Sequence, residues 1–110
     1  MDAVEIATAA AQGFALLQCE DCANKVQQAL TAAGLSAERI ELRSGGEKEF
    51  MACLSYDGGR TSITLNGRHL GIRVGGLVFD NLHPNGVGYD EWLKDFDAPL
   101  GVVVFRIDRF

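Results

Sequence analysis

The sequence predicts an α+β domain in which N-terminal helices pack on an antiparallel β-sheet. Two helix-like segments occupy residues 3–12 and 19–33. After Gly34 the helical spacing of apolar residues gives way to short strand-like runs separated by glycine turns. Helices followed by a series of strands, instead of alternating with them, are typical of α+β folds. The length fits one domain, residues 1–110.

The two helices are predicted from composition, spacing and end signals. The segment 3–12 is rich in alanine, and Gly13 follows it as a stop signal. Apolar residues recur on one face of the second segment, at Ala23, Val26, Leu30 and Ala33. Glu20 and Asp21 lie in its first turn, where the helix dipole favours negative charge, and Gly34 closes it.

Strand-like runs fill most of the remaining chain. They lie at residues 40–42, 50–56, 62–65, 69–74, 77–80 and 102–108. The turn signals "SGG", "DGG", "NG" and "GG" separate most of them. Residues 82–100 form a long connection, in which we expect one helical turn near Trp92.

Charge and cysteine content narrow the classes of partner. The net charge is −5 and no run of basic residues occurs, so we expect no nucleic-acid partner. We expect no membrane partner either, because no segment is long and apolar enough to span one. The N-terminal stretch lacks a basic region and carries Asp2 and Glu5, unlike a signal peptide. Three cysteines, an odd number, favour a reducing environment over a disulfide scaffold.

The stretch "QCEDCA" at residues 18–23 places Cys19 and Cys22 three positions apart. A zinc site needs four ligands, and the remaining Cys53 and the two histidines form no second ligand pair. A redox pair would follow a strand in a βαβ unit, which the predicted order lacks. We therefore expect no metal and no cofactor, although two buried structural cysteines remain an alternative.

Cys19 has the position of a nucleophile. It begins the second helix, where unpaired N–H groups and positive potential stabilise a thiolate, although the neighbouring Glu20 and Asp21 oppose this effect. The backbone N–H of Cys19 is also placed to donate to an oxyanion. A histidine far along the chain, His69, opens a strand directly after an "NG" turn. A cysteine with a distant histidine is the pattern of a thiol hydrolase.

The run "HLGIRVGGLVFDN" predicts a hairpin with Gly75 and Gly76 as a two-residue turn. This register places His69 and Asp80 on one face as diagonal neighbours, within side-chain reach, and turns Asn81 away. Asp80 would then orient the imidazole by a hydrogen bond. The alternative is an exposed ion pair of little energetic value. The predicted core face carries Leu70, Ile72, Val74, Leu77 and Phe79.

The segments "FALLQCEDCANKVQQALTAAGL" and "NGRHLGIRVGGLVFDNLHPNG", with the following tryptophan, resemble the papain-fold toxin domains of bacterial polymorphic toxin systems. The resemblance covers roughly residues 14–107. It implies a papain-like cysteine peptidase with Cys19, His69 and Asp80 as catalytic residues. Related cores have a catalytic cysteine, two variable residues, a bulky residue and alanine, which favours Cys19. Papain's own C-x-x-C-x-A pattern, in which the second cysteine is catalytic, makes Cys22 the alternative nucleophile.

The resemblance also implies roles for other residues. Gln18 is a weak candidate for an oxyanion donor, because papain-like enzymes use a glutamine upstream of the cysteine, although not adjacent to it. The papain pattern often has asparagine as the orienting residue, which makes Asn81 the alternative to Asp80. We expect His83 to order the loop that follows it and Trp92 to pack under the sheet.

Such domains are secreted or contact-delivered effectors that act in the cytoplasm of the target cell. The resemblance therefore implies a protein substrate and a cognate immunity protein. The acidic residues Asp90, Glu91, Asp95 and Asp97 suggest an immunity protein with a basic surface, or else only a solvated face. Two other functions remain open: glutamine deamidation or transglutamination on the same fold, and a binding module without catalysis.

Overall fold

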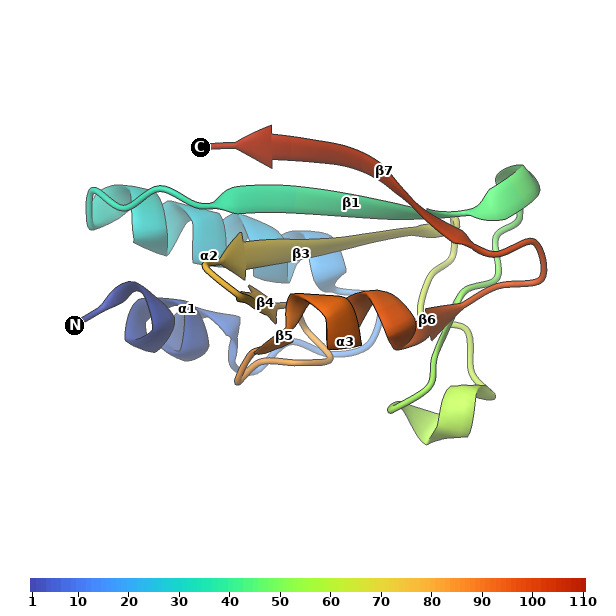
Figure 1. Ribbon diagram of the computed structural model, residues 1–110. Coiled ribbons are helices and arrows are strands. Elements are labelled where there is room, and N and C mark those ends of the chain that lie inside the picture. The colour runs from blue at the N-terminus through green and yellow to red at the C-terminus, as the bar shows by residue number, and fades with distance from the viewer.

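The computed structural model describes all 110 residues, apart from the side chain of residue 47. It contains a five-stranded antiparallel sheet of strand order β5-β4-β3-β1-β7 and a small two-stranded ribbon of β2 and β6 (Figure 1). The helices are α1 (Ala3–Ala11), α2 (Cys19–Ala32) and α3 (Tyr89–Lys94). The sheet strands are β1 (Glu38–Ser44), β3 (Arg68–Val74), β4 (Leu77–Phe79), β5 (Val87–Gly88) and β7 (Val102–Arg109). The ribbon strands are β2 (Ala52–Cys53) and β6 (Phe96–Asp97), and short 3-10 turns occupy Gly45–Glu47 and Asp57–Gly59. The predicted α+β class is confirmed.

Both predicted N-terminal helices are confirmed to within a residue at their ends. Asp2 caps α1 through a reciprocal capping box with Glu5, which satisfies two free backbone N–H groups. The helix α2 ends in a Schellman-type turn, in which the N–H of Leu35 bonds the carbonyl of Leu30 at 2.9 Å. Gly34 makes this turn with a φ of 74°, a conformation that suits glycine.

The central strands of the sheet are buried on both faces, so the fold has two cores, whereas the edge strand β7 is mostly exposed. Helices α1 and α2 cover one face, and α3 with the β2–β6 ribbon covers the other (Figure 1). The first core joins helix residues such as Val26 and Leu30 to Leu70, Ile72 and Phe79 of the sheet. The second core packs Ile40, Leu42 and Val78 against Met51, Ile63, Trp92 and Phe96.

The β3–β4 hairpin has the predicted register. Val74 pairs with Leu77, and Arg73 pairs with Val78, across a turn in which Gly75 has a φ of 60°. The predicted core face packs in the first core as expected. The opposite face, which carries His69 and Asp80, lies under the second core, because α3 returns across it.

Two of the predicted strands, at residues 50–56 and 62–65, are mostly loop in the structure. Within residues 50–56 only Ala52–Cys53 is extended and paired, and residues 62–65 contribute a single bridge, from Ser62 to Ala52. Their apolar residues reflect burial of loops, since Met51 and Ile63 fill the second core without joining a sheet. The helical turn predicted near Trp92 is confirmed as α3, and it is flanked by two short strands.

No helix described in the structure combines the length and the apolar composition that crossing a membrane requires.

Candidate functional site

Cys19 is the first residue of α2 and is partly exposed. Its thiol borders a cleft of about 190 Å³, whose lining includes Leu17, Ile63, Leu65 and Arg68. Arg68 also binds the carboxylate of Glu20 at 3.2 Å, so one of the two acidic side chains in the first turn is paired. The cysteine therefore combines a helix N-terminus with access from solvent, the two conditions expected of a reactive thiol.

His69 lies on β3 and is fully buried. Its Nε2 donates to Oδ2 of Asp80 at 2.7 Å, and its ring packs on Phe96 with the centroids 4.8 Å apart. The other ring nitrogen, Nδ1, has no hydrogen-bond partner among the described side chains. Because Nε2 is occupied, Nδ1 is the atom left to exchange a proton with Cys19, the thiol whose pKa is coupled to this ring.

Asp80 is fully buried and accepts five hydrogen bonds. Oδ2 accepts from His69 and from the indole N–H of Trp92, at 2.7 and 2.8 Å. Oδ1 accepts from the backbone of Leu82 and from both the backbone and the ring of His83. Burial raises the pKa of Asp80, but the hydrogen bonds and charges of the two histidines lower it by more. The pKa of this carboxyl is therefore well below its usual range, and the group is ionised.

The two cysteines of the C-x-x-C stretch have opposite pKa shifts. Burial raises the pKa of the Cys19 thiol, but the nearby charge of His69 and the backbone N–H of Leu70 lower it by more, giving a net decrease. Burial, followed by the nearby charges of Asp80 and Cys19, raises the pKa of Cys22 to about 12. Cys22 is fully buried beside the carbonyl of Ala11, the environment of a packing residue. All three cysteines are free thiols.

Burial lowers the pKa of His69, but the hydrogen bond to Asp80 and the charges of Asp80 and Cys19 raise it by more, to about 9. A raised imidazole pKa beside a lowered thiol pKa is the signature of a thiolate–imidazolium pair. The arrangement can therefore supply a nucleophile and a proton donor at neutral pH.

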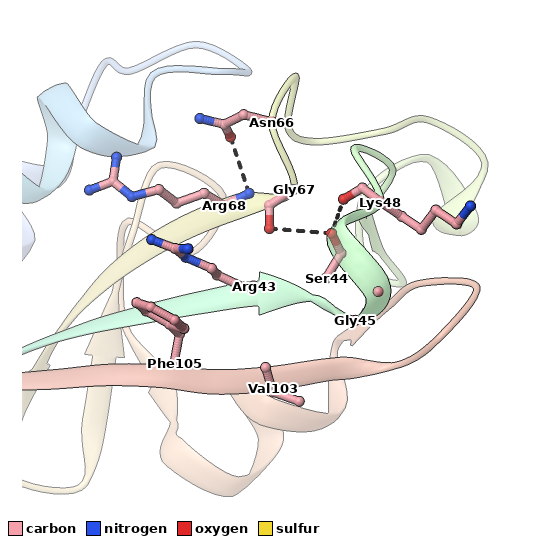
Figure 2. A pocket seen from close by; sticks show the side chains of 10 residues that line it. Arg43, Ser44, Gly45, Lys48, Asn66, Gly67, Arg68, Val103 and Phe105 are labelled. Carbon is pink, nitrogen blue, oxygen red and sulfur yellow. Dashed lines mark hydrogen bonds between the residues drawn. The ribbon is translucent and has the colours of Figure 1, made fainter.

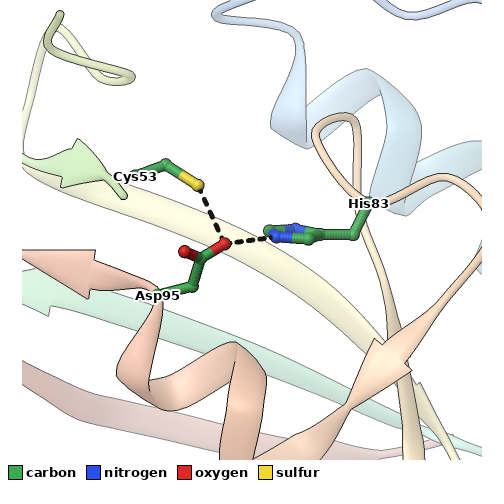
Figure 3. A group of neighbouring side chains, drawn as sticks. All are labelled: Cys53, His83 and Asp95. Carbon is green, nitrogen blue, oxygen red and sulfur yellow. Dashed lines mark hydrogen bonds and ion pairs between the residues drawn. The ribbon is translucent and has the colours of Figure 1, made fainter. Parts of the chain in front are cut away.

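A second cluster of titratable groups lies on the other side of Asp80. Cys53, His83 and Asp95 place their ligand-type atoms within 4.8 Å of one another (Figure 3). This cluster also has the composition of a cysteine, histidine and aspartate triad. The order differs, because Asp95 Oδ2 lies between the other two, 3.2 Å from Cys53 Sγ and 2.7 Å from His83 Nε2. Both ring nitrogens of His83 thus contact carboxylates, since Nδ1 bonds Asp80 at 2.8 Å.

Three other residues named from the sequence, Gln18, Asn81 and Trp92, lie near the site without contacting Cys19 in any hydrogen bond among the described residues. The side-chain oxygen of Gln18 accepts from the backbone of Ala15, while its backbone caps α2. Asn81 also turns toward Ala15, through its side-chain nitrogen, and away from His69, as the hairpin register predicted. Trp92 is buried under the sheet as expected, but its bond to Asp80 was not foreseen.

Two expectations need correction. The side chain of His83, assigned to ordering its own loop, instead joins Asp80 to Asp95. Asp95 does not share a solvated acidic face, because its carboxylate turns inward to Ser55 and His83. Neither residue was paired with Cys53 from the sequence. The sequence shows only that all three are residue types that bind metals or protons, with 30 residues from Cys53 to His83 and 12 from His83 to Asp95.

A larger cavity of about 730 Å³ adjoins the Cys19 cleft and shares Asn66 and Arg68 with it. Arg43 stacks over the ring of Phe105, with the guanidinium 3.6 Å from the ring centroid, and lines this cavity with Val103 (Figure 2). Arg43 and Arg68 both pair with Glu41, so the two arginines of the lining share one carboxylate. The two hollows together extend the accessible surface away from Cys19 along the ends of β1, β3 and β7.

Two helices packed on an antiparallel sheet, with a cysteine at a helix start facing a histidine on the sheet, define a papain-like domain. The family comparison agrees with this class. The model of the papain fold toxin 2 family matches residues 2–97, so the chain belongs to that family. The resemblance noted in the sequence is therefore confirmed. The comparisons with curated proteins and with solved structures gave no match.

Proposed function

We propose that this toxin domain is a cysteine hydrolase that cleaves an amide bond in a protein of the target cell. Cys19 is the nucleophile, His69 the general acid and base, and Asp80 the orienting carboxylate. The observation that carries the proposal is the position of Cys19 at a cleft, with a buried histidine whose Nε2 bonds a buried carboxylate; the lowered pKa of the thiol agrees with it. Nucleophile, base and orienter are the parts that thiol catalysis requires.

In the acylation step, the Cys19 thiolate attacks the substrate carbonyl carbon and forms the S–C bond. The backbone N–H of Cys19, at the open end of α2, is placed to donate to the oxyanion. Collapse of the intermediate breaks the C–N bond, and the His69 imidazolium gives its Nδ1 proton to the leaving amine. Water then attacks the thioester, with neutral His69 accepting its proton, and the thiolate is regenerated.

The same thioester serves other acyl-transfer chemistry. If the attacked amide is a glutamine side chain, hydrolysis gives deamidation, and attack by a lysine amine gives a crosslink. The mass of a modified target distinguishes these outcomes: a cut chain, a gain of about one mass unit, or two joined chains. The absence of selective thiol reactivity and of any target modification would instead favour a binding module.

The Cys53, His83 and Asp95 cluster is the second candidate, favoured by the closeness of its three groups. We rank it second for two reasons. Cys53 is fully buried, and the carboxylate occupies the position between thiol and imidazole that the base would need.

Induced expression in bacteria, followed by mapping of new protein N-termini, tests the proposal. Cells that express the unchanged domain should show growth arrest and new N-termini, and cells that express Cys19→Ala should show neither. Toxicity that survives Cys19→Ala but is lost in Cys53→Ala would transfer the active site to the second cluster.

The partners follow from this proposal. The producing cell needs an immunity protein against such an activity, and the exposed acidic residues Asp90, Glu91 and Asp97 favour one with a basic surface. Delivery to the target cell, by secretion or by contact, would be supplied by other parts of the toxin system. Co-expression of the neighbouring gene product should rescue growth and yield a stable complex, and the absence of both would contradict this partner.

A further inference from the structure

The second cluster offers a mixed sulfur, nitrogen and oxygen ligand set. Cys53 comes from β2, His83 from the loop after β4, and Asp95 from the C-terminal end of α3. These segments are far apart in sequence, and the three groups meet under the sheet (Figure 3). Cys53 is fully buried, and the side chains of His83 and Asp95 are only 10% and 17% exposed. A cysteine thiolate, a histidine nitrogen and an aspartate oxygen are ligand types that zinc takes in proteins.

The outer contacts of the cluster are those of a metal site as well. A metal-binding histidine almost always donates its other ring N–H to a carboxylate or carbonyl, which fixes its tautomer. His83 does this through Nδ1, which bonds Asp80 Oδ1 at 2.8 Å and leaves Nε2 directed at the cluster. Asp95 is held in turn, because its Oδ1 accepts the backbone N–H of Ser55 at 2.9 Å.

The spacing requires little movement to admit an ion. Tetrahedral zinc holds neighbouring nitrogen, oxygen and sulfur ligands roughly 3.3–3.7 Å apart, given its bond lengths. In the structure Cys53 Sγ lies 3.2 Å from Asp95 Oδ2, and His83 Nε2 lies 2.7 Å from the same oxygen. Widening the group to these separations requires the Asp95 carboxylate oxygen to move away from His83 by roughly 0.6 Å. The Ser55 hydroxyl, 3.4 Å from both Cys53 Sγ and His83 Nε2, marks the fourth position.

We propose that Cys53, His83 and Asp95 bind a zinc-type transition-metal ion, with the fourth position on the solvent side beside Ser55. Thiolate and imidazole ligands select zinc and its neighbours over magnesium and calcium, which prefer all-oxygen sites. Binding displaces the thiol proton of Cys53 to solvent and forms the metal–sulfur bond. The ion ties β2, the β4 loop and α3 together, and therefore stabilises the half of the fold that covers Asp80. The site is separate from the Cys19 cleft, so its test is independent of the proposed catalysis.

Cobalt(II) is the probe, because a thiolate ligand gives a charge-transfer band and a tetrahedral site gives intense visible absorption. The reduced, chelator-treated full chain should bind one equivalent and show both bands. Zinc added afterwards should displace the cobalt and abolish them. Absence of the thiolate band in the folded chain would overturn the proposal.

Variants identify the ligands. Cys53→Ala should lose the thiolate band, and Asp95→Asn should weaken cobalt binding at least about tenfold. Asp90→Asn, an exposed carboxylate on the same helix, is the matched control and should bind normally. Cys19→Ala and Cys22→Ala should retain the band. A band that persists in Cys53→Ala or disappears in Cys19→Ala would place the metal at the other thiol and refute the proposal. Circular dichroism checks that each variant is folded. If Cys53→Ala does not fold, the weakened binding of Asp95→Asn still decides the test.

Discussion

The Nε2 atom of His69 lies 2.7 Å from Oδ2 of Asp80, and neither side chain is exposed to solvent. Because both side chains are buried, this contact is not the exposed ion pair that the sequence left as an alternative. A buried carboxylate is costly unless its oxygens are satisfied, and Asp80 meets this condition with five donors. The pair is thus a fixed structural unit, and the Nδ1 atom of His69 takes no part in it.

Replacement of the two cysteines of the C-x-x-C stretch should have opposite consequences. Cys19→Ala should abolish toxicity with little loss of stability, because this thiol is partly exposed at the cleft. Cys22→Ala should keep most of the toxicity and cost about 1 kcal/mol of unfolding free energy, because it removes one small buried group. Growth assays on induced expression and urea unfolding measure the two quantities.

Iodoacetamide labelling provides a readout that needs no substrate. At neutral pH, mass spectrometry should find Cys19 labelled first, because the pKa of Cys22 is raised to about 12 and Cys53 is buried. Preferential labelling of Cys22, together with toxicity in Cys19→Ala, would reverse the assignment.

Asp80→Asn should reduce activity at least about tenfold, because an amide stabilises the imidazolium of His69 less well than a carboxylate does. The variant should also lose about 1–3 kcal/mol of stability, since its NH₂ group must face a donor at either oxygen position. Asn81→Ala is the matched control, because Asn81 contacts Ala15 and not His69. Growth inhibition should be compared at temperatures where urea unfolding shows both variants folded. Loss of activity in Asn81→Ala alone would contradict the assigned role of Asp80.

The hairpin was predictable because its features are local. Two glycines at the turn determine the pairing, and strict alternation along β3 and β4 then determines which residues share a face with His69. The position of Cys19 at a helix start was predictable for the same reason, since the end signals of α2 are contiguous in the sequence.

The second cluster was not predictable, because long-range packing creates it. Cys53 and Asp95 meet only where β2 pairs with β6, a contact of two residues on each strand. The apolar runs at 50–56 and 62–65 have strand-like composition, yet they serve as buried loops. Composition alone does not tell a buried loop from a paired strand.

Gly71→Ala should destabilise the domain by about 1–3 kcal/mol, the usual cost of an added atom in a packed core. A Cβ at position 71 would lie 2.7 Å from both the indole of Trp92 and a methyl of Val78. Displacement of the indole would also loosen its bond to Asp80. Gly76→Ala is the matched control in the same hairpin, because its Cβ would meet nothing within 4 Å. Urea unfolding should show a large shift for position 71 and almost none for position 76, and equal shifts would contradict the packing described.

The pH dependence of Cys19 alkylation tests the coupling between thiol and imidazole. Because the pKa of Cys19 is lowered, its thiolate persists at acidic pH where an ordinary thiol is protonated, so the midpoint of the alkylation profile should lie below that of a free cysteine. His69→Gln removes the charge that favours the thiolate, and the midpoint should move to higher pH.

The hydrolytic activity should also fall on the alkaline side, because His69 loses its proton near pH 9 and can then no longer protonate the leaving amine. His83→Gln is the control for a histidine outside the pair and should leave the midpoint within a few tenths of a pH unit, because His83 reaches Cys19 only through Asp80. If His69→Gln leaves the profile unchanged while His83→Gln shifts it, the Cys19 thiol is coupled to His83, and the role assigned to His69 is wrong.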